Sequence, residues 1–351
     1  MGLAKTVKDG RWFPVFRFRE IATGFSHFAA VFSLSIFTII KEAFQPTGDM
    51  LKTDLRVGIS GWRYGPWRNN FYPAGLPMRQ ELAFASRQVN SIEINGSFYS
   101  LQDVSSWQLW YRETPDKFRF SIKGSRFITH MKKLKDVEKP LANFFAQGIL
   151  ALKEKLGPIL WQFPPGFAFH AEKFDSFFRL LPATTGDALR LARRRDHRMK
   201  GRSYLRIDEN RSLQHAVEIR HESFRSTEFT DLLRKWNIAL VVADTAGKWP
   251  FMEDVTANFV YARLHGDKEL YVSGYTSDAL DLWARRVRVW RKKKLGVYVY
   301  FDNDVKVKAP FDAIALARRV GGFEPLDVRV TAPADSPEEA RTSWPAIGFR
   351  R

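Results

Sequence analysis

The segment HAVEIRHESF, residues 215–224, begins as an apolar strand and ends in a group of polar side chains. Glu218 and Arg220 are two residues apart, so a strand points both to the same side. A buried strand that carries an acid and a base on one face needs a reason, because each unpaired buried charge is costly. The segment therefore predicts one strand of a sheet whose polar groups converge on a single site.

The composition is that of a globular protein with a strongly basic balance. The 351 residues are 45% hydrophobic and 27% charged, and the net charge is +18. Such a charge favours contact with nucleic acid, phosphate groups or a membrane surface, with a solvated basic surface as the alternative. The chain contains no cysteine, which excludes disulfides and thiolate chemistry and is typical of a reducing compartment. We therefore expect a cytoplasmic protein; its oligomeric state cannot be predicted.

Residues 1–50 differ from the rest of the chain. A basic, aromatic start precedes an uncharged stretch, residues 21–40, that is about long enough to span a bilayer but contains several polar residues. It fits a signal anchor, an amphipathic extension, or a translated upstream region foreign to the native protein. We favour the last two together, because a complete fold starts at Leu55. We expect a membrane contact only if residues 21–40 are a true anchor.

From Leu55 onward, strand-like and helix-like segments alternate. The expected strands cover residues 55–60, 89–94, 117–122, 158–163, 215–220, 238–244, 259–265 and 296–302. The expected helices cover residues 78–88, 104–113, 138–155, 171–181, 226–236, 277–293 and 310–320. Gly157-Pro158 is expected to end the third of these helices. Eight strands, most followed by a helix, predict an α/β fold, a (β/α)8 TIM-type barrel.

An open doubly wound sheet is the alternative fold. It is less favoured because no Gly-rich phosphate loop follows the first strand. The predicted barrel domain covers residues 55–322 and includes a basic insertion at about 184–214 with weak helical character. Residues 323–351, rich in proline and charge, are expected to form a weakly ordered tail.

Strand alternation predicts which side chains face the barrel axis. In most strands one parity is apolar and should face the helices, which leaves polar residues of the other parity inside. These inward positions are Ser91, Glu93, Asn95, Arg119, Ser121, Lys123, Gln162, Glu218, Arg220, Tyr261, Arg263, His265, Tyr298, Tyr300 and Asp302. Since barrel interiors usually consist of Val, Ile and Leu, polar groups near the carboxyl ends of the strands indicate a site or a self-satisfied ion-pair network.

Two sets of residues carry the predicted site. The catalytic candidates are Glu93, Glu218, His221, Asp244, His265 and Asp302, as bases, acids or proton shuttles. The ligand-binding candidates are Trp62, Tyr64, Asn95, Tyr99, Lys123, Gln162, Arg220, Arg263, Tyr300 and Asn303. Among them, guanidinium and ammonium groups suit a phosphate or carboxylate. His130 and His170 are interpreted as loop or capping residues.

Several motifs resemble one family along residues 55–321. They are GISGWRYGPW (58–67), FYP (71–73), SIEINGSFYS (91–100), ITH (128–130), WQFPP (161–165), VEIRHESF (217–224), YARLHG (261–266) and VYFDND (299–304). Together they resemble the YecE-like family, domain of unknown function 72. The resemblance implies a TIM-type barrel and supplies no reaction. This sequence departs from the family pattern at two places. The family usually has Asn at the place of Asp302, and it begins close to the first strand, without a segment like residues 1–50.

Three functions compete. The first is an enzyme, such as a hydrolase, lyase or isomerase, that acts on a small polar or anionic ligand by Glu/His acid–base chemistry without a cofactor. The second is a metal-dependent barrel hydrolase or isomerase, which the nearby cations disfavour because they compete for the carboxylates. We expect no metal ligands. The third is a non-enzymatic protein that contacts nucleic acid through its basic surface.

Overall fold

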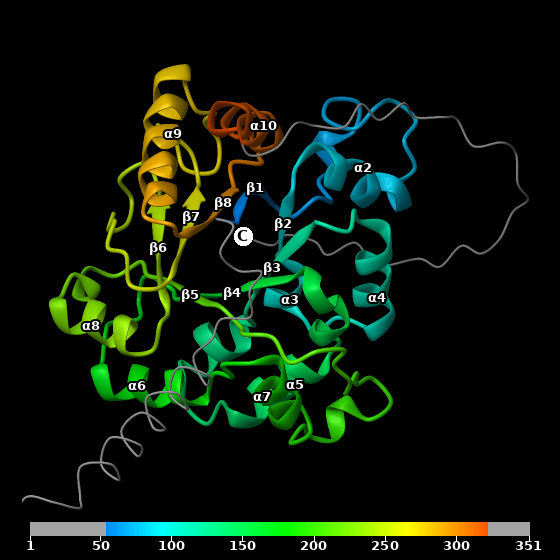
Figure 1. Cartoon of the computed structure of the whole chain (residues 1–351), viewed down its shortest axis with the longest axis vertical. Coiled ribbons are helices and arrows are strands. Elements are labelled where there is room, and N and C mark those ends of the chain that lie inside the picture. The colour runs from blue at the N-terminus through cyan, green and yellow to red at the C-terminus, as the bar shows by residue number, and fades with distance from the viewer. Residues whose placement is uncertain (1–53, 322–351) are drawn as a thin grey trace, which may run out of the picture. The chain divides into compact units, whose positions relative to one another are not determined.

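The computed structural model describes residues 54–321, and the predicted N-terminal extension and C-terminal tail lie outside the described residues. Eight parallel strands close into a barrel in sequence order, with helices around the outside (Figure 1). The strands are β1 Leu55–Ser60, β2 Ser91–Ile94, β3 Arg119–Lys123, β4 Leu156–Gln162, β5 His215–Glu218, β6 Ala239–Asp244, β7 Phe259–Leu264 and β8 Gly296–Phe301. The predicted TIM-type fold is confirmed.

Helices connect most of the strands. They are α2 Glu81–Gln88, α3 Gly96–Tyr99, α4 Val104–Glu113, α5 Glu138–Ala146, α6 Ala171–Leu180, α7 Thr185–Ala192, α8 Thr227–Lys235, α9 Ser277–Lys292 and α10 Ala309–Val320. Short 3-10 turns occur at Gly65–Trp67, Met78–Gln80, Ile149–Lys155, His197–Met199 and Glu222–Phe224, and a π-helical turn at Phe127–Met131. As expected, no described helix joins β6 to β7.

The strand parities separate two hydrophobic layers. The outward side chains of the strands, such as Ile59 and Val299, join a large core beneath the helices. A smaller inner cluster fills the barrel with members of the other parity, among them Val241 and Tyr261. Because the inner cluster contains few large aliphatic side chains, polar groups occupy positions that branched residues fill in other barrels.

Local predictions failed at one helix. The helix expected over residues 138–155 ends at Ala146, because Gly148 adopts a φ of 124° and a Cβ there would collide with Trp107. The chain resumes as a 3-10 helix and enters β4 at Leu156. Gly157-Pro158 therefore lies inside a strand and does not end a helix.

The basic segment at 184–214 is more ordered than its sequence predicts. Thr184 and Asp187 form a reciprocal capping box that starts α7. Arg193 and Arg194 follow the helix and are exposed. Among residues 54–321, no helix is long and apolar enough to cross a membrane.

Candidate functional site

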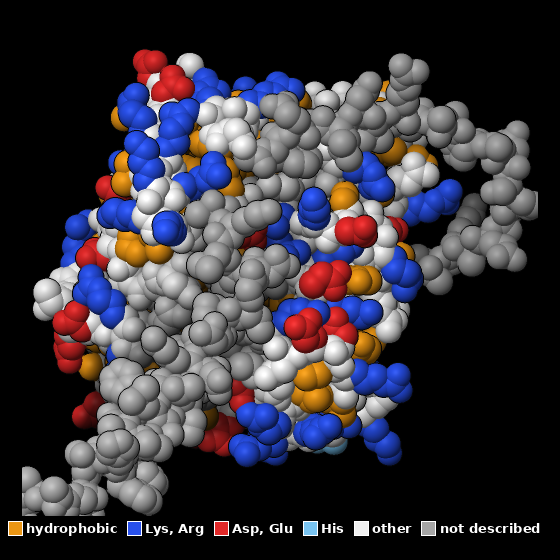
Figure 2. Space-filling view, in the orientation of Figure 1, with side chains coloured by type: hydrophobic (Ala, Val, Ile, Leu, Met, Phe, Trp, Pro, Cys, Tyr) orange, Lys and Arg blue, Asp and Glu red, His pale blue; other side chains and the backbone are white. Residues whose placement is uncertain are grey.

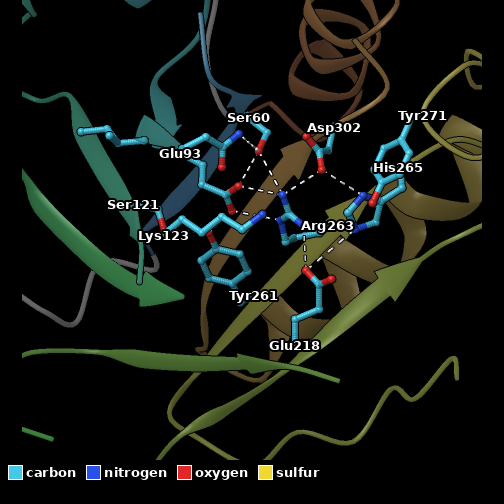
Figure 3. A network of polar contacts seen from close by, with 12 residues as sticks. Ser60, Glu93, Ser121, Lys123, Glu218, Tyr261, Arg263, His265, Tyr271 and Asp302 are labelled. Atoms are coloured by element: carbon cyan, nitrogen blue, oxygen red, sulfur yellow. Dashed lines mark hydrogen bonds and ion pairs between the residues drawn. The ribbon is translucent and has the colours of Figure 1, made fainter. Parts of the chain in front are cut away.

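Arg263, near the carboxyl end of β7, is the centre of a buried polar network inside the barrel (Figure 3). Its Nε donates to Glu93 Oε2 at 3.0 Å, and its Nη2 donates to Glu93 Oε1 at 2.8 Å. Nη1 donates to Glu218 Oε2 at 2.7 Å, and Nη2 also reaches Asp302 Oδ2 at 2.9 Å. One guanidinium thus binds three carboxylates from β2, β5 and the end of β8.

The two glutamates are also saturated by other donors. Glu93 accepts hydrogen bonds from Ser60 Oγ and from Tyr261 Oη, the latter at 2.6 Å. Arg220 donates through Nε to Glu218 Oε1 at 2.9 Å. Although burial opposes ionisation, the charges of Arg263 and Arg220 hold the pKa of Glu218 well below its usual range. The low pKa makes Glu218 a weak base, and donors of the network already occupy the oxygens of both glutamates.

His265 lies beside the network as a neutral imidazole. Its Nε2 lies 3.2 Å from Arg263 Nη1, which can only donate, and its Nδ1 lies 3.0 Å from Asp302 Oδ2. This geometry favours the Nδ1–H tautomer. Burial and the charge of Arg263 lower the pKa of His265, and the ring is fully buried. The imidazole therefore lies against Asp302 and Arg263, buried from solvent.

Lys123, the last residue of β3, differs from the other cations of this site. Its Nζ makes no hydrogen bond or ion pair with any residue of the described range 54–321, and it lies 4.6 Å from the centre of the Phe98 ring. Burial and the neighbouring charge of Arg263 lower its pKa to about 8. Its ammonium group is thus held near the carboxylates without a direct partner.

Arg220 is a second cation with unused donors. Its Nε and Nη2 contact Glu218 and the Tyr271 hydroxyl, and its guanidinium stacks on Trp249 at 3.8 Å from the ring centre. Within the described part of the chain, no acceptor contacts Nη1. The side chain of Arg220 retains 11% exposure, whereas that of Arg263 retains none. Arg220 can therefore offer a ligand the N–H groups that Arg263 cannot.

Asp304 was missed by the sequence interpretation. It follows β8 beside Asp302, and burial together with the Asp302 charge raises its pKa to about 7. The charge of Arg263 and the contact with His265 hold the pKa of Asp302 well below its usual range, although burial opposes this. Two neighbouring carboxyl groups with separated protonation are typical of acid–base pairs. The second acid of the run FDND was the signal that could have identified Asp304.

His130 was interpreted as a loop residue, yet it lies near the candidate site. It belongs to the π-helical turn after β3, a geometry frequent at functional sites. Its Nε2 is 3.5 Å from Nε2 of Gln162, and its ring meets Phe98 edge-on at 5.1 Å. Burial and the charge of Lys123 lower the pKa of His130 to about 4. The imidazole is therefore neutral at physiological pH.

Four predicted site residues lie elsewhere. Asp244 accepts a hydrogen bond from Trp283 on α9, because Ala243 and its parity mates face the axis. His221 caps the turn Glu222–Phe224, since β5 ends at Glu218 and alternation no longer orients its side chain. Asn303 donates to Asp312 on α10, on the opposite side from Asp302. These three, and Trp62, do not join the Arg263 network.

Trp62 and Tyr64 diverge within the loop after β1. Trp62 is buried in the outer core, edge-on to Trp110 of α4 at 5.3 Å, because Gly61 turns the chain outward with a φ of 84°. Tyr64 instead donates to the Ser60 carbonyl at 2.6 Å and contacts Asp304. The loop aromatics thus mostly pack into the core, and Tyr64 alone of this pair approaches the network.

The remaining candidates occupy different depths. Tyr300 bonds Ser91 at 2.7 Å in the buried inner layer, which keeps it from contacting a ligand directly. Asn95 donates to Ser60 Oγ at 3.1 Å, and Gln162 is buried beside His130. Tyr99 is 51% exposed and carries Arg126 over its ring. We therefore expect the more exposed of these side chains to contact a ligand, and the fully buried ones to hold the exposed ones in place.

The described residues offer no cluster of three or more acidic or histidine side chains suited to a metal ion. The guanidinium of Arg263 itself fills the space between the three carboxylates that a cation would share. A cavity of about 210 Å³ is lined by Tyr99, Lys139 and Arg198 among others, and none of its lining residues belongs to the Arg263 network.

Known proteins of one family share this fold and match most of the chain. A family model described as "Protein of unknown function DUF72" matches residues 56–337. A DUF72 family protein from Thermotoga maritima has 25% identity and a TM-score of 0.62, covering 76% of this chain and 99% of that chain. One from Enterococcus faecalis has 16% identity and a TM-score of 0.61, covering 79% and 100%.

A curated relative matches a shorter stretch. The UPF0759 protein YunF of Bacillus subtilis is 26% identical over 116 residues, which is 32% of this chain and 40% of that protein. The chain therefore spans less than half the length of this relative in the match.

Proposed function

This chain belongs to the DUF72 family of proteins of unknown function, and we propose that its barrel is an enzyme that binds a small anionic ligand and performs acid–base chemistry on it. The ligand would bind at the carboxyl ends of the strands, where barrel enzymes hold their sites. The proposal rests on the side chains at that end and on the depth at which each lies.

The observation that carries the proposal is the ammonium of Lys123, which has no hydrogen-bond or ion-pair partner among residues 54–321. Every other described charge of the network has a carboxylate or guanidinium partner within hydrogen-bonding distance, whereas Lys123 has only a nearby ring. A desolvated cation without a partner is costly to the fold. A ligand carboxylate or phosphate would offset that cost, which is the reason to place the anionic group beside Lys123 and the open Nη1 of Arg220.

Acid–base chemistry is assigned to Asp302 and Asp304. A general acid works best when its pKa is near the working pH, and the pKa of Asp304 is about 7. Asp302 stays ionised beside it, with 14% side-chain exposure. This assignment replaces Glu93 and Glu218 as the predicted bases, because their oxygens are already occupied. Arg263 becomes a positioning residue instead of a ligand-binding one.

A nucleic-acid contact is the second candidate. Arg193, Arg194 and Arg198 are exposed after α7, close to Lys139, whose Nζ donates to the Arg194 carbonyl at 3.0 Å. Figure 2 shows further basic side chains along α9, interspersed with hydrophobic and acidic ones. Phosphate groups would bind such a surface mainly through charge, so this contact would weaken steeply with salt.

Ligand-detected NMR with a panel of phosphorylated and carboxylated metabolites would test the enzyme proposal. We expect at least one anion to bind the unmodified protein, to bind at least tenfold more weakly to Lys123→Met, and to bind normally to Lys173→Met. Lys173 is an exposed lysine on α6, and its replacement controls for loss of charge alone. Equal binding to all three proteins, or no binding by any, would contradict the proposal.

A further inference from the structure

Resting on the proposed anion site, we infer that Lys123 is an amine nucleophile that forms an imine with a small carbonyl compound bearing a carboxylate or phosphate group. The inference goes further than ligand binding, because it assigns Lys123 a covalent step and assigns the substrate a reactive carbonyl. Both assignments follow from the position of its Nζ among the surrounding side chains.

The position of Lys123 is that of a nucleophile and not of a structural cation. It ends β3 with 9% exposure, and no carboxylate oxygen of residues 54–321 comes within ion-pair distance of its Nζ. Lys155 shows the contrasting arrangement. Its Nζ donates to the carbonyls of Tyr111 and Thr114, each at 2.7 Å, and to the Thr114 hydroxyl at 3.3 Å. Lys155 is held as a structural donor, whereas the Nζ of Lys123 has no such acceptor within the described part of the chain.

The surroundings of Lys123 favour a reactive amine. Burial and the adjacent guanidinium of Arg263 both disfavour a second positive charge, which lowers the pKa of Lys123 to about 8. Roughly one-tenth of such an amine is neutral at pH 7, against roughly one part in 2500 of an ordinary lysine. Desolvation beside another cation is a known way to activate a lysine toward carbonyl groups.

The covalent step needs no reactant besides the substrate. The neutral Nζ attacks the carbonyl carbon, forming the C–N bond while the carbonyl π electrons move to oxygen, which takes up a proton. The nitrogen then loses a proton, and its lone pair forms the C=N bond as the hydroxyl leaves as water. Over the whole step, the nitrogen gives up two protons and the oxygen leaves with both as water, so the step balances without a further reactant. Hydrolysis of the imine restores Lys123.

Recognition of the anionic group is assigned to Arg220. Its Nη1 hydrogens have no acceptor within the described chain, and Trp249 and Glu218 hold its guanidinium in place. A planar guanidinium whose orientation is fixed can bind a carboxylate or phosphate at little entropic cost. The site thus combines a nucleophile on β3 with an anion-binding group after β5. This pairing favours 2-oxo acids or phosphorylated carbonyl compounds over uncharged aldehydes.

Reductive trapping tests the inference with three defined probes. The full-length protein is incubated with glyoxylate, pyruvate or uncharged propanal together with cyanoborohydride, and the modified lysines are mapped by peptide mass spectrometry. We expect glyoxylate or pyruvate to modify Lys123 at least tenfold more than Lys155 or exposed Lys173. Propanal should lack this preference. Arg220→Gln should reduce trapping of the two acids at Lys123 several-fold and leave propanal trapping unchanged.

Lys123→Arg separates the inference from the proposed function. Arginine keeps the positive charge but cannot form the imine, so this variant should retain anion binding and lose selective trapping at position 123. If Lys123 in the folded, anion-binding protein is modified no faster than Lys173 by either acid, the imine inference is wrong and the anion site stands. If, in addition, no anion binds the unmodified protein, both are wrong.

Discussion

Replacing Arg263 by methionine should be among the most destabilising single changes in this barrel. Methionine approximates the volume of the arginine stem but removes the hydrogen bonds that Arg263 donates to Glu93, Glu218 and Asp302. The carboxylates keep other neighbours: Ser60 and Tyr261 for Glu93, Arg220 for Glu218, and the adjacent His265 for Asp302. The charges are therefore not isolated, but their mutual repulsion is no longer compensated.

The expected loss for Arg263→Met is about 3–5 kcal/mol, the usual cost of removing one partner from a buried ion pair. Arg263→Lys keeps the charge, but one ammonium group cannot reproduce the contacts that Nε, Nη1 and Nη2 make with three carboxylates. We therefore expect a smaller loss of folding free energy, about 1.5–3 kcal/mol. The assay is urea unfolding at pH 7 followed by circular dichroism. With an m-value of about 2–3 kcal/mol/M, the midpoint of Arg263→Met should fall by roughly 1–2 M.

The pH dependence provides an independent check. The pKa values of Glu218 and Asp302 are lowered in the folded protein. These two carboxylates therefore stabilise the fold above their unfolded pKa of about 4, and this stabilisation is lost as pH falls further. In Arg263→Met these carboxyl groups should protonate more readily. The deficit of the variant should therefore shrink as pH falls through about 4 and below. A deficit under about 0.5 kcal/mol at pH 7 would refute the network as a stabilising unit.

Three further predictions follow from other parts of the molecule. Asp304→Asn should remove the gain in folding stability expected as pH falls from about 7 toward 4, because the folded pKa of Asp304 is raised; unfolding curves that keep this gain would contradict the assignment. Changing Arg193, Arg194 and Arg195 together to alanine should leave the circular dichroism spectrum intact and reduce any binding to generic DNA, together with its salt dependence; unchanged titrations would remove this contact. A chain lacking residues 1–50 should remain folded, and insolubility or loss of the thermal transition would show that the barrel needs that segment.

Much of the barrel could be predicted because eight strand-like segments alternate along the chain with seven helix-like ones. The same alternation indicated that Glu93, Glu218 and Arg263 face the axis, and the structure brings them together. It failed where a strand ends earlier or an apolar strand has no marked parity. His221 lies beyond the end of β5, and the apolar β6 gave no indication that Asp244 faces α9.

Residue types alone could not predict which arginine N–H groups already have an acceptor in the fold. Arg263 and Arg220 are both inward guanidinium groups in the sequence, yet only Arg220 keeps N–H groups without an acceptor within the described range. Asp304 was missed because its raised pKa depends on burial beside Asp302, and burial in a loop has no periodic signal. Contacts between distant strands decide such properties, so the chain alone does not specify them.

The titration of Lys123 tests most directly whether this residue is an activated lysine that binds an anion. In protein carrying ¹⁵N-labelled lysine, the Nζ resonance assigned through Lys123→Arg should titrate with a midpoint near pH 8. Because an anion stabilises the charged amine, inorganic phosphate should raise that midpoint, while the resonance of exposed Lys173 should not respond. A midpoint near 10.4, the ordinary value for lysine, with no response to phosphate would contradict an activated, anion-binding lysine in the barrel.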